Sequence, residues 1–304
     1  MSKTLIILNP HAAGGRAGLL WKQLEPLLWQ ELGELVVAIT ERPEEVAKHL
    51  DEAYACGLTR VISVGGDGTN HALVNALAQH NQRNPTIPPM VYGSFPIGTG
   101  LDWARGLGIP ANDLKAAAHW IAHATPQPTD VGSLTFDDQR EFFLNIASAG
   151  LGGEVARRIN ASAKRRPWTF LWSTVRTLLD YTPPEMRVWL DGSLWYEGRA
   201  YAAAVANGTT FGHGMKIAPN AEFRDGLFDV VLVEGVSRFT VLTALQRVYR
   251  ATHLSHPAVR SARASEVRIE SPHGAALDLE LDGEHTAGRS LTFRVHPGLL
   301  DILS

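Results

Sequence analysis

The segment 61–69, Val-Ile-Ser-Val-Gly-Gly-Asp-Gly-Thr, constrains the fold of this chain more than any other feature. A β-branched run leads into a glycine-rich turn, and the apolar-periodic run 72–77 follows, so the pattern predicts strand, turn and helix. The unpaired N–H groups and the positive dipole end of such a helix attract phosphate, and glycines let the anion come close. A plain tight turn is the alternative, but it does not need the charge of Asp67. The predicted phosphate ligands are Gly65, Gly66, Gly68 and Thr69.

Two further glycine-rich segments, 9–16 and 96–105, also follow strand-like runs. In an open parallel sheet such loops meet at the carboxyl edge of the strands, where ligands bind. None of the three loops matches the P-loop pattern Gly-x4-Gly-Lys-Ser/Thr or the dinucleotide pattern Gly-x-Gly-x-x-Gly. The sequence therefore predicts a nucleotide-phosphate site of another kind.

The first 130 residues alternate between strand and helix patterns, which predicts a doubly wound α/β domain with a buried parallel sheet. Predicted strands cover 5–8, 35–39, 61–64 and 91–95. Predicted helices cover 17–32, 44–55, a segment ending near 79, and 114–123.

From about residue 130 the strand-like runs follow one another, which predicts a mostly β sandwich domain interrupted by helices near 153–180 and 237–250. Predicted strands cover 141–148, 186–190, 194–207, 227–233, 266–269, 276–281 and 291–295. Asp-Gly pairs mark the turns at 191–192, 225–226 and 282–283. We expect domains at 1–129, which the tail 297–304 could join, and at 130–296, with 125–129 as the linker.

Composition excludes several classes of protein. The chain has 304 residues and a formal net charge of −3, so it lacks the basic field that sequence-independent nucleic-acid binding needs. Its single cysteine, Cys56, fits a reducing compartment and is expected to be a small buried side chain. The sequence shows no signal segment and no apolar run of about 18 residues. We expect a cytoplasmic protein that could touch the inner face of a membrane from one side.

With these residues in view, the chain resembles the diacylglycerol-kinase-type lipid kinases of the bacterial soluble group, which are related to sphingosine kinases and have an NAD-kinase-like fold. The resemblance runs from Asn9-Pro10 to Asp282-Gly283-Glu284. Gly-Gly-Asp-Gly-Thr is shared with NAD kinases and, more distantly, with phosphofructokinases. The resemblance implies transfer of the γ-phosphate from ATP, with Mg²⁺, to diacylglycerol or a related lipid alcohol.

The resemblance also implies roles for individual residues. Those expected at the nucleotide are Asn9, Thr40, Gly65, Gly66, Asp67, Gly68, Thr69, Thr99 and Asp102. Asp130 resembles the aspartate that opens the second domain. The Asp225 carboxylate, with the Glu222 and Leu227 carbonyls, resembles a structural magnesium site. Glu284 resembles the proton acceptor, so Glu284 and Asp67 are the expected catalytic pair.

The chain departs from the family pattern at two places. Leu101 stands where an asparagine is usual, and His71-Ala72 stands where Asn-Glu is usual. The departures remove an amide and a carboxylate that could contact adenine or metal.

Two segments of the second half bear on the lipid. The basic run 164–166 precedes an amphipathic helix pattern with Trp168 and Trp172, which predicts either a cover for the β domain or a contact with anionic lipid. The glycine-rich segment 207–215 resembles a loop at the lipid entrance, with His213 as a loop contact rather than a metal ligand. We expect a lipid substrate, transient contact with the membrane surface and no nucleic acid; the resemblance allows a homodimer.

Two other functions stay open from the sequence. An NAD kinase-like small-molecule kinase would share the glycine loops, but its polar acceptor fits poorly with the Trp- and Phe-rich segments. A non-catalytic nucleotide- or lipid-binding protein is favoured by Leu101 and Ala72.

Overall fold

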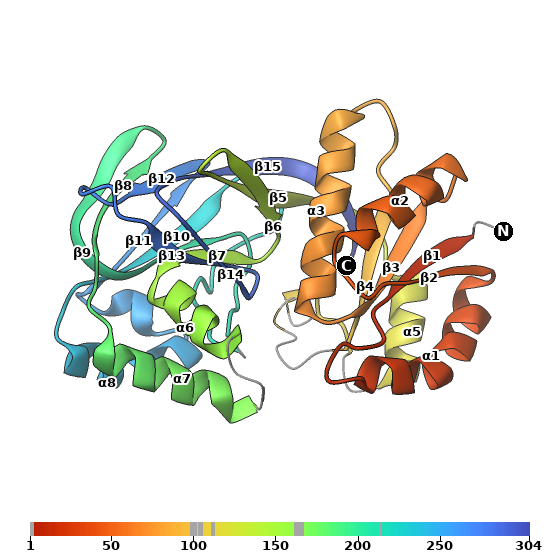
Figure 1. Ribbon diagram of the computed structural model, residues 1–304, viewed down its shortest axis with the longest axis horizontal. Coiled ribbons are helices and arrows are strands. Elements are labelled where there is room, and N and C mark those ends of the chain that lie inside the picture. The colour runs from red at the N-terminus through yellow and green to blue at the C-terminus, as the bar shows by residue number, and fades with distance from the viewer. Residues whose placement is uncertain (1–2, 98–101, 103–105, 111–112, 161–166, 213) are drawn as a thin grey trace. The chain divides into compact units, whose positions relative to one another are not determined.

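The computed structural model describes residues 3–97, 102, 106–110, 113–160, 167–212 and 214–304. The chain forms two compact units (Figure 1): unit 1 comprises Met1–Val131 and Pro297–Ser304, and unit 2 comprises Gly132–His296. Two strands, β5 (Pro126–Phe136) and β15 (Ser290–Leu303), each contribute residues to both units. None of the helices within the described ranges is long and apolar enough to cross a membrane.

Unit 1 is built on a parallel sheet with the strand order β2–β1–β3–β4–β15. Its other strands are β1 (Thr4–Leu8), β2 (Leu35–Ile39), β3 (Arg60–Gly65) and β4 (Val91–Pro96). The end of β15 joins through Ile302, which lies opposite Tyr92 of β4. All five residues of β1 are buried, because helices cover both faces of a parallel sheet of this kind.

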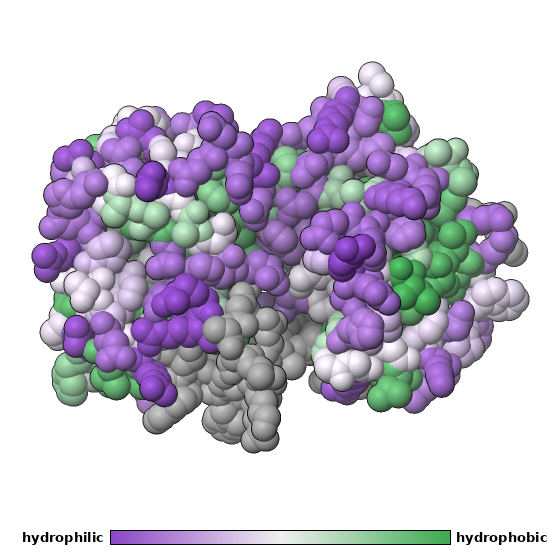
Figure 2. Space-filling model, viewed as in Figure 1, coloured by the Kyte–Doolittle hydropathy of each residue, from purple (hydrophilic) through white to green (hydrophobic). Residues whose placement is uncertain are grey.

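The helices of unit 1 pack in two pairs (Figure 1). The first pair, α1 (Arg16–Leu32) and α5 (Leu114–His123), shares an apolar cluster with the sheet. The second pair is α2 (Glu45–Ala55) and α3 (Asp67–Arg83). Edge strand β2 pairs only with β1 and exposes 60% of Ile39, and Figure 2 shows a hydrophobic area at this edge of the unit.

Unit 2 is a β sandwich whose two layers share strand β9 (Ser193–Ala206). One layer contains β5, β6 (Gln139–Phe143), β8 (Glu185–Leu190), β12 (Glu266–Glu270) and the first part of β15. The other contains β7 (Ile146–Gly150), β10 (Phe228–Glu234), β11 (Val259–Ala264), β13 (Leu277–Leu281) and β14 (Glu284–Gly288). Large apolar side chains such as Phe143, Phe228 and Phe293 fill the space between the layers.

The second layer is apolar on both of its faces. Ala203 and Val205 of β9 belong to the core of the sandwich, whereas Ala202 and Ala204 line a cavity on the opposite face, as strand alternation requires. Helices α6 (Leu151–Asn160), α7 (Pro167–Asp180) and α8 (Arg238–Tyr249) lie over this outer face (Figure 1).

The predicted fold class, an α/β domain followed by a mostly β sandwich, is confirmed, but several elements differ from the prediction. The predicted strand 141–148 is two strands, β6 and β7, because the N–H groups of Leu144 and Asn145 bond to the carboxylate of Asp282 instead of a neighbouring strand. The predicted linker 125–129 mostly belongs to β5, whose prolines stand at the beginning of the strand, where a missing donor is tolerated. Cys56 ends α2 and is exposed, so its predicted burial is wrong.

Candidate active site

The loops that follow β1 and β3 meet Ile97, the residue directly after β4, at one edge of the sheet in unit 1. A β-carbon on Gly66 would lie 3.7 Å from the carbonyl oxygen of Ile97 and 4.0 Å from the β-carbon of Ala12. The N–H of Ile97 donates to the carbonyl of Gly65 at 3.2 Å, and the N–H of Asn9 donates to the carbonyl of Val64 at 3.1 Å. The carboxyl ends of three neighbouring strands therefore present their loops together.

The turn at Gly65 brings the beginning of helix α3 to this edge. A side chain at Gly65 is excluded, because its β-carbon would lie 2.5 Å from Oγ1 of Thr69. Gly66 is the N-cap and no side chain caps the helix; Asp67 occupies its first turn. The arrangement offers backbone N–H groups and a positive dipole end to an anion, and the carboxylate of Asp67 favours a cation between itself and a phosphate.

Asn70, which the sequence analysis did not single out, anchors the first turn of α3 to the sheet. Its Oδ1 accepts hydrogen bonds from the hydroxyls of Ser63 at 2.6 Å, Tyr92 at 3.1 Å and Ser94 at 3.1 Å. The three donors come from β3 and β4, so one side-chain oxygen fixes the helix against two strands. In the sequence, this role of Asn70 is indicated only by the three hydroxyl residues in the neighbouring strands.

The other predicted nucleotide residues lie at strand ends or outside the described residues. Oδ1 of Asn9 accepts from the N–H of His11 at 3.0 Å, and the buried Thr40 donates through Oγ1 to the carbonyl of Leu8 at 3.4 Å. Asp102 is half-buried. The remaining predicted positions, Thr99, Leu101, the basic run 164–166 and His213, lie outside the described residues.

Glu284 follows a tight hairpin turn in unit 2. Asp282 and Gly283 have φ angles of 49° and 97°, as a two-residue turn between β13 and β14 requires. Glu284 is the first residue of β14, directly after the turn, and it pairs with Leu281. Its side chain is half-buried at the end of the hairpin.

The carboxylate of Asp282 holds this turn in place. It accepts the N–H groups of Leu144 at 2.7 Å, Asn145 at 2.9 Å and Ile146 at 3.1 Å. Such charge-assisted bonds are about twice as strong as neutral ones, so the position of Glu284 is tied to the segment between β6 and β7.

Two buried asparagines frame the same segment. Nδ2 of Asn145 donates to the carbonyl of Thr210 at 2.7 Å, and Nδ2 of Asn207 donates to the carbonyl of Leu144 at 2.8 Å. A side chain at Gly208 would lie 2.2 Å from Oδ1 of Asn145, so the chain must have glycine there. The sequence analysis quoted Asn207 only as part of a glycine-rich loop and did not single out Asn145.

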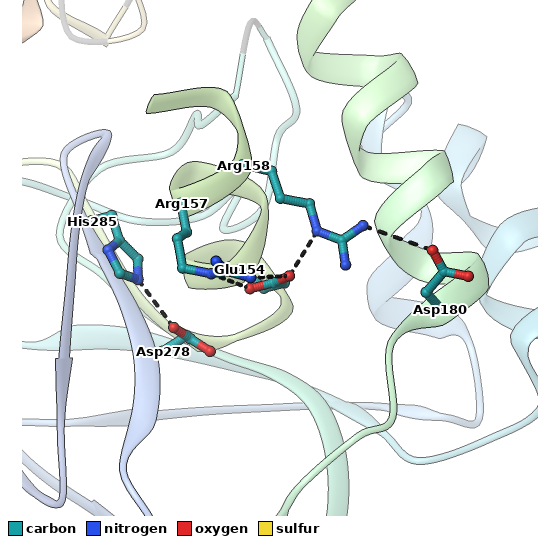
Figure 3. A network of polar contacts seen from close by, with 6 residues as sticks. All are labelled: Glu154, Arg157, Arg158, Asp180, Asp278 and His285. Atoms are coloured by element: carbon teal, nitrogen blue, oxygen red, sulfur yellow. Dashed lines mark hydrogen bonds and ion pairs between the residues drawn. The ribbon is translucent and has the colours of Figure 1, made fainter. Parts of the chain in front are cut away.

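A polar network beside the hairpin fixes helix α6 (Figure 3). Glu154 accepts from Nε of both Arg157 and Arg158 at 2.7 Å, and these hydrogen bonds hold the pKa of Glu154 below its usual value. Across from it, Nε2 of His285 lies 3.0 Å from Oδ1 of Asp278 (Figure 3). A β-carbon on Gly153 would lie 2.3 Å from the backbone of Asp278, so the helix packs directly on β13.

An apolar cavity of about 150 Å³ lies between the outer face of the second layer and helices α6, α7 and α8. Its walls are mostly aliphatic and aromatic side chains, and they come from strands, helices and the loop before β10. They include Ile146, Val155, Ala204, Phe211, Val231 and Leu245. The ring of His253 also lines the cavity; its Nε2 lies 2.8 Å from the carbonyl of Ile217, and burial lowers its pKa.

The residues of the predicted magnesium site lie together in unit 2. Asp225 accepts the N–H of Leu227 at 3.0 Å and pairs with the guanidinium of Arg263. Oδ2 of Asp229 is buried and accepts no hydrogen bond, although Nε of Arg263 lies 3.7 Å away; burial and the charge of Glu222 raise the pKa of Asp229. Asp225 and Asp229 thus lie near one guanidinium, with Glu222 close to Asp229, and carboxylate oxygens of this kind are ligands that a hard cation such as Mg²⁺ accepts.

Both halves of the chain match models of known protein families. A family model described as diacylglycerol kinase catalytic domain matches residues 3–134, and one described as YegS C-terminal NAD kinase beta sandwich-like domain matches residues 145–304. A probable lipid kinase YegS-like of Chromohalobacter salexigens is 30% identical over 270 residues, 88% of this chain and 82% of the relative. The diacylglycerol kinase of Bacillus subtilis is 27% identical over 227 residues, 74% of this chain and 71% of the relative.

Solved structures agree on the fold. A diacylglycerol kinase from Bacillus anthracis superposes with a TM-score of 0.73 at 21% identity, covering 99% of this chain and 96% of the other. Yeast NADH kinase in complex with NADH superposes with a TM-score of 0.52 at 12% identity, covering 99% of this chain and 82% of the other.

Proposed function

This chain belongs to the diacylglycerol kinase family of lipid kinases, and on that premise we propose that it transfers the γ-phosphate of ATP, complexed with Mg²⁺, to the hydroxyl of diacylglycerol or a related lipid alcohol. Unit 1 supplies the phosphate loops, and unit 2 supplies the acceptor pocket and the base. As a kinase, the protein needs a phosphoryl donor at helix α3 and an alcohol as acceptor.

The observation that carries the lipid assignment is the apolar cavity. Cavities of this size with mostly apolar walls take up hydrocarbon, whereas the hydroxyls of a ribose would lose most of their hydrogen bonds there. Val231 and Ala204 face the cavity from neighbouring strands and suit the methylene groups of an acyl chain. This supports a lipid acceptor over the polar acceptor of an NAD kinase.

The chemistry asks for positioning, charge neutralisation and one proton acceptor. The lipid hydroxyl oxygen bonds to the γ-phosphorus, the bond from that phosphorus to the β–γ bridging oxygen breaks, and ADP leaves. Glu284 takes the hydroxyl proton. Mg²⁺ bound to ATP would neutralise phosphate charge, with Asp67 and Asp102 as the side chains that hold it. Asn9, Thr40, Gly65, Gly66, Gly68, Thr69 and Thr99 would contact the nucleotide.

A second magnesium ion would have a structural role in unit 2. Asp225 and the carbonyls of Glu222 and Leu227 would hold it, with Asp229 beside them. The ion would neutralise the negative charge of carboxylates that lie close together in a partly buried position.

The lipid would be taken from a membrane surface by the helices that cover the cavity. Leu179 of α7 and Phe239 of α8 expose 54% and 76% of their area, which suits contact with acyl chains at an interface. We infer a cytoplasmic enzyme that binds the inner face of the membrane transiently. The homodimer and the absence of nucleic-acid binding stay predictions.

The test is a transfer assay with radiolabelled ATP and Mg²⁺, in which diacylglycerol, sphingosine and monoacylglycerol in detergent micelles compete with NAD. We expect label in a lipid and none in NAD. Label in NAD would replace the lipid assignment. Hydrolysis of ATP without a labelled acceptor, or no turnover, would point to the losses at Leu101 and Ala72.

A further inference from the structure

Glu31, His119 and His123 form a cluster on the surface of unit 1, where α1 packs against α5 (Figure 1). His119 and His123 are one turn apart on α5, and Glu31 comes from the last turn of α1. Nδ1 of His119 lies 3.4 Å from Oε1 of Glu31. One possible ligand atom from each residue lies within 4.8 Å of the others.

We propose that these three side chains bind a divalent cation of the zinc class, with water completing the coordination. Two ligands that are each about 2.1 Å from a tetrahedral zinc ion lie about 3.4 Å apart, which is the separation of His119 Nδ1 and Glu31 Oε1. Two histidines four residues apart on a helix are a known zinc-binding arrangement, and two histidines with one glutamate are a known ligand set with an open fourth position.

The hydrogen bonding of His123 determines which of its two ring nitrogens would bind the ion. Its Nδ1 lies 2.8 Å from the carbonyl of His119, so the proton belongs on Nδ1 and the lone pair on Nε2. A backbone carbonyl partner of this kind fixes the tautomer of metal-binding histidines. Imidazole ligands favour zinc, cobalt or nickel over Mg²⁺, so the site is distinct in chemistry from the magnesium sites of the kinase reaction.

A bound ion would cross-link two helices that belong to the same apolar cluster. α1 begins directly after the glycine loop 9–15, so the ion would stabilise the element that carries this loop. Binding to the folded state alone raises stability by mass action. The proposal does not depend on the identity of the phosphoryl acceptor.

The test uses tag-free full-length protein with Cys56→Ser, stripped with a chelator and titrated with ZnCl₂ by calorimetry without nucleotide. We expect a single saturable site, and an increase of about 5 °C in the unfolding temperature at a hundredfold excess over Kd. MgCl₂ should not reproduce the shift. His119→Ala and Glu31→Gln should each weaken zinc binding at least tenfold.

His273→Ala is the matched control, because His273 also pairs with an exposed carboxylate, that of Glu185 at 3.1 Å, and no third ligand of this kind lies beside that pair among the described residues. It should bind zinc as the parent protein does. The proposal is overturned if no saturable site is found, if His119→Ala binds zinc normally, or if His273→Ala loses as much affinity as His119→Ala.

Discussion

The two candidate sites are built in opposite ways. In unit 1 the candidate phosphate edge is made of backbone groups in short contiguous loops, and the side chain of Asn70 anchors the helix that presents them. In unit 2 the cavity proposed for the acyl chain has walls that come from many segments, and the proposed base, Glu284, lies on a hairpin that distant N–H groups hold in place. An anion can be bound by main-chain donors that any sequence supplies, whereas a hydrocarbon must be bound by the side chains themselves.

The largest effects are expected when the carboxylates of Glu284 and Asp67 are each replaced by an amide. The two variants should show that unit 2 supplies the base and unit 1 binds the phosphates. Glu284→Gln keeps the shape of the side chain and removes the proton acceptor, so we expect a loss of about 10³-fold in kcat with little change in ATP affinity. Asp67→Asn should lower kcat and weaken ATP binding together, because it acts on the phosphate side. Steady-state kinetics and ATP titration check both, and circular dichroism checks folding. Equal losses in kcat and ATP affinity for Glu284→Gln would argue against a base.

Replacing Asn70, which anchors α3 to the sheet, should lower the stability of the protein more than its catalytic rate. Asn70→Leu removes the oxygen that accepts from three buried hydroxyls and should lower the free energy of unfolding by about 2 kcal/mol. Urea denaturation measures the change. Ser94→Ala removes one donor and leaves Asn70 with two, so its effect should be smaller than that of Asn70→Leu. If the two variants are equally stable, the network does not hold the helix.

Filling the cavity should change the preference for lipid chain length without changing the binding of ATP. Ala204→Leu adds three carbons to a side chain that faces the cavity, so we expect KM for long-chain lipids to rise about tenfold while KM for ATP stays constant. Short-chain substrates should be affected less. Leu194→Met, at an exposed position of the same strand, should leave both constants unchanged. A uniform effect on all chain lengths would place the acyl chain elsewhere.

The smallest effect concerns pH. Burial lowers the pKa of His253, and burial with the charges of Arg140 and Arg294 lowers the pKa of His296, so both histidines bind protons less readily in the folded state. Stability is therefore complete above their unfolded pKa of about 6.5 and falls as the pH decreases below it, by at most about 1.4 kcal/mol per pH unit for each histidine. Urea unfolding between pH 8 and 5 checks the sign. His253→Phe should reduce the slope, and an unchanged slope would exclude His253 as a source.

The parts of the fold that depend on local pattern could be predicted from the sequence. Strand β2 and helix α5 have the predicted bounds, because the continuous apolar run of β2 and the helical periodicity of α5 are each contained within the segment. The break between β6 and β7 could not be predicted, since the carboxylate that causes it is 138 residues away at Asp282. Strand β14, Glu-His-Thr-Ala-Gly, has little strand propensity of its own and exists because the turn pairs it with β13.

For the candidate sites as well, features contained in one segment could be predicted, and features that depend on distant segments could not. The strand–turn–helix unit at Gly65–Thr69 could be predicted because its pattern is contiguous in sequence, and its role as a phosphate ligand stays a prediction. Asn70 and Asn145 could not be predicted, because their role depends on donors and acceptors from other elements. The cavity depends on alternate residues of β7, β9 and β10, each of which has apolar residues on both faces, so the sequence does not tell which face is open.

The contribution of residues 297–304 to unit 1 has a consequence for biosynthesis. Leu300, Ile302 and Leu303 are fully buried, and Ile302 lies beside β4, so the sheet beneath the glycine loops lacks a strand until these residues have left the ribosome. Although its loops are translated early, the nucleotide-binding half should reach its native stability only after the β sandwich has been synthesised. A nascent chain released before residue 297 would expose the open side of β4 to pairing with other chains.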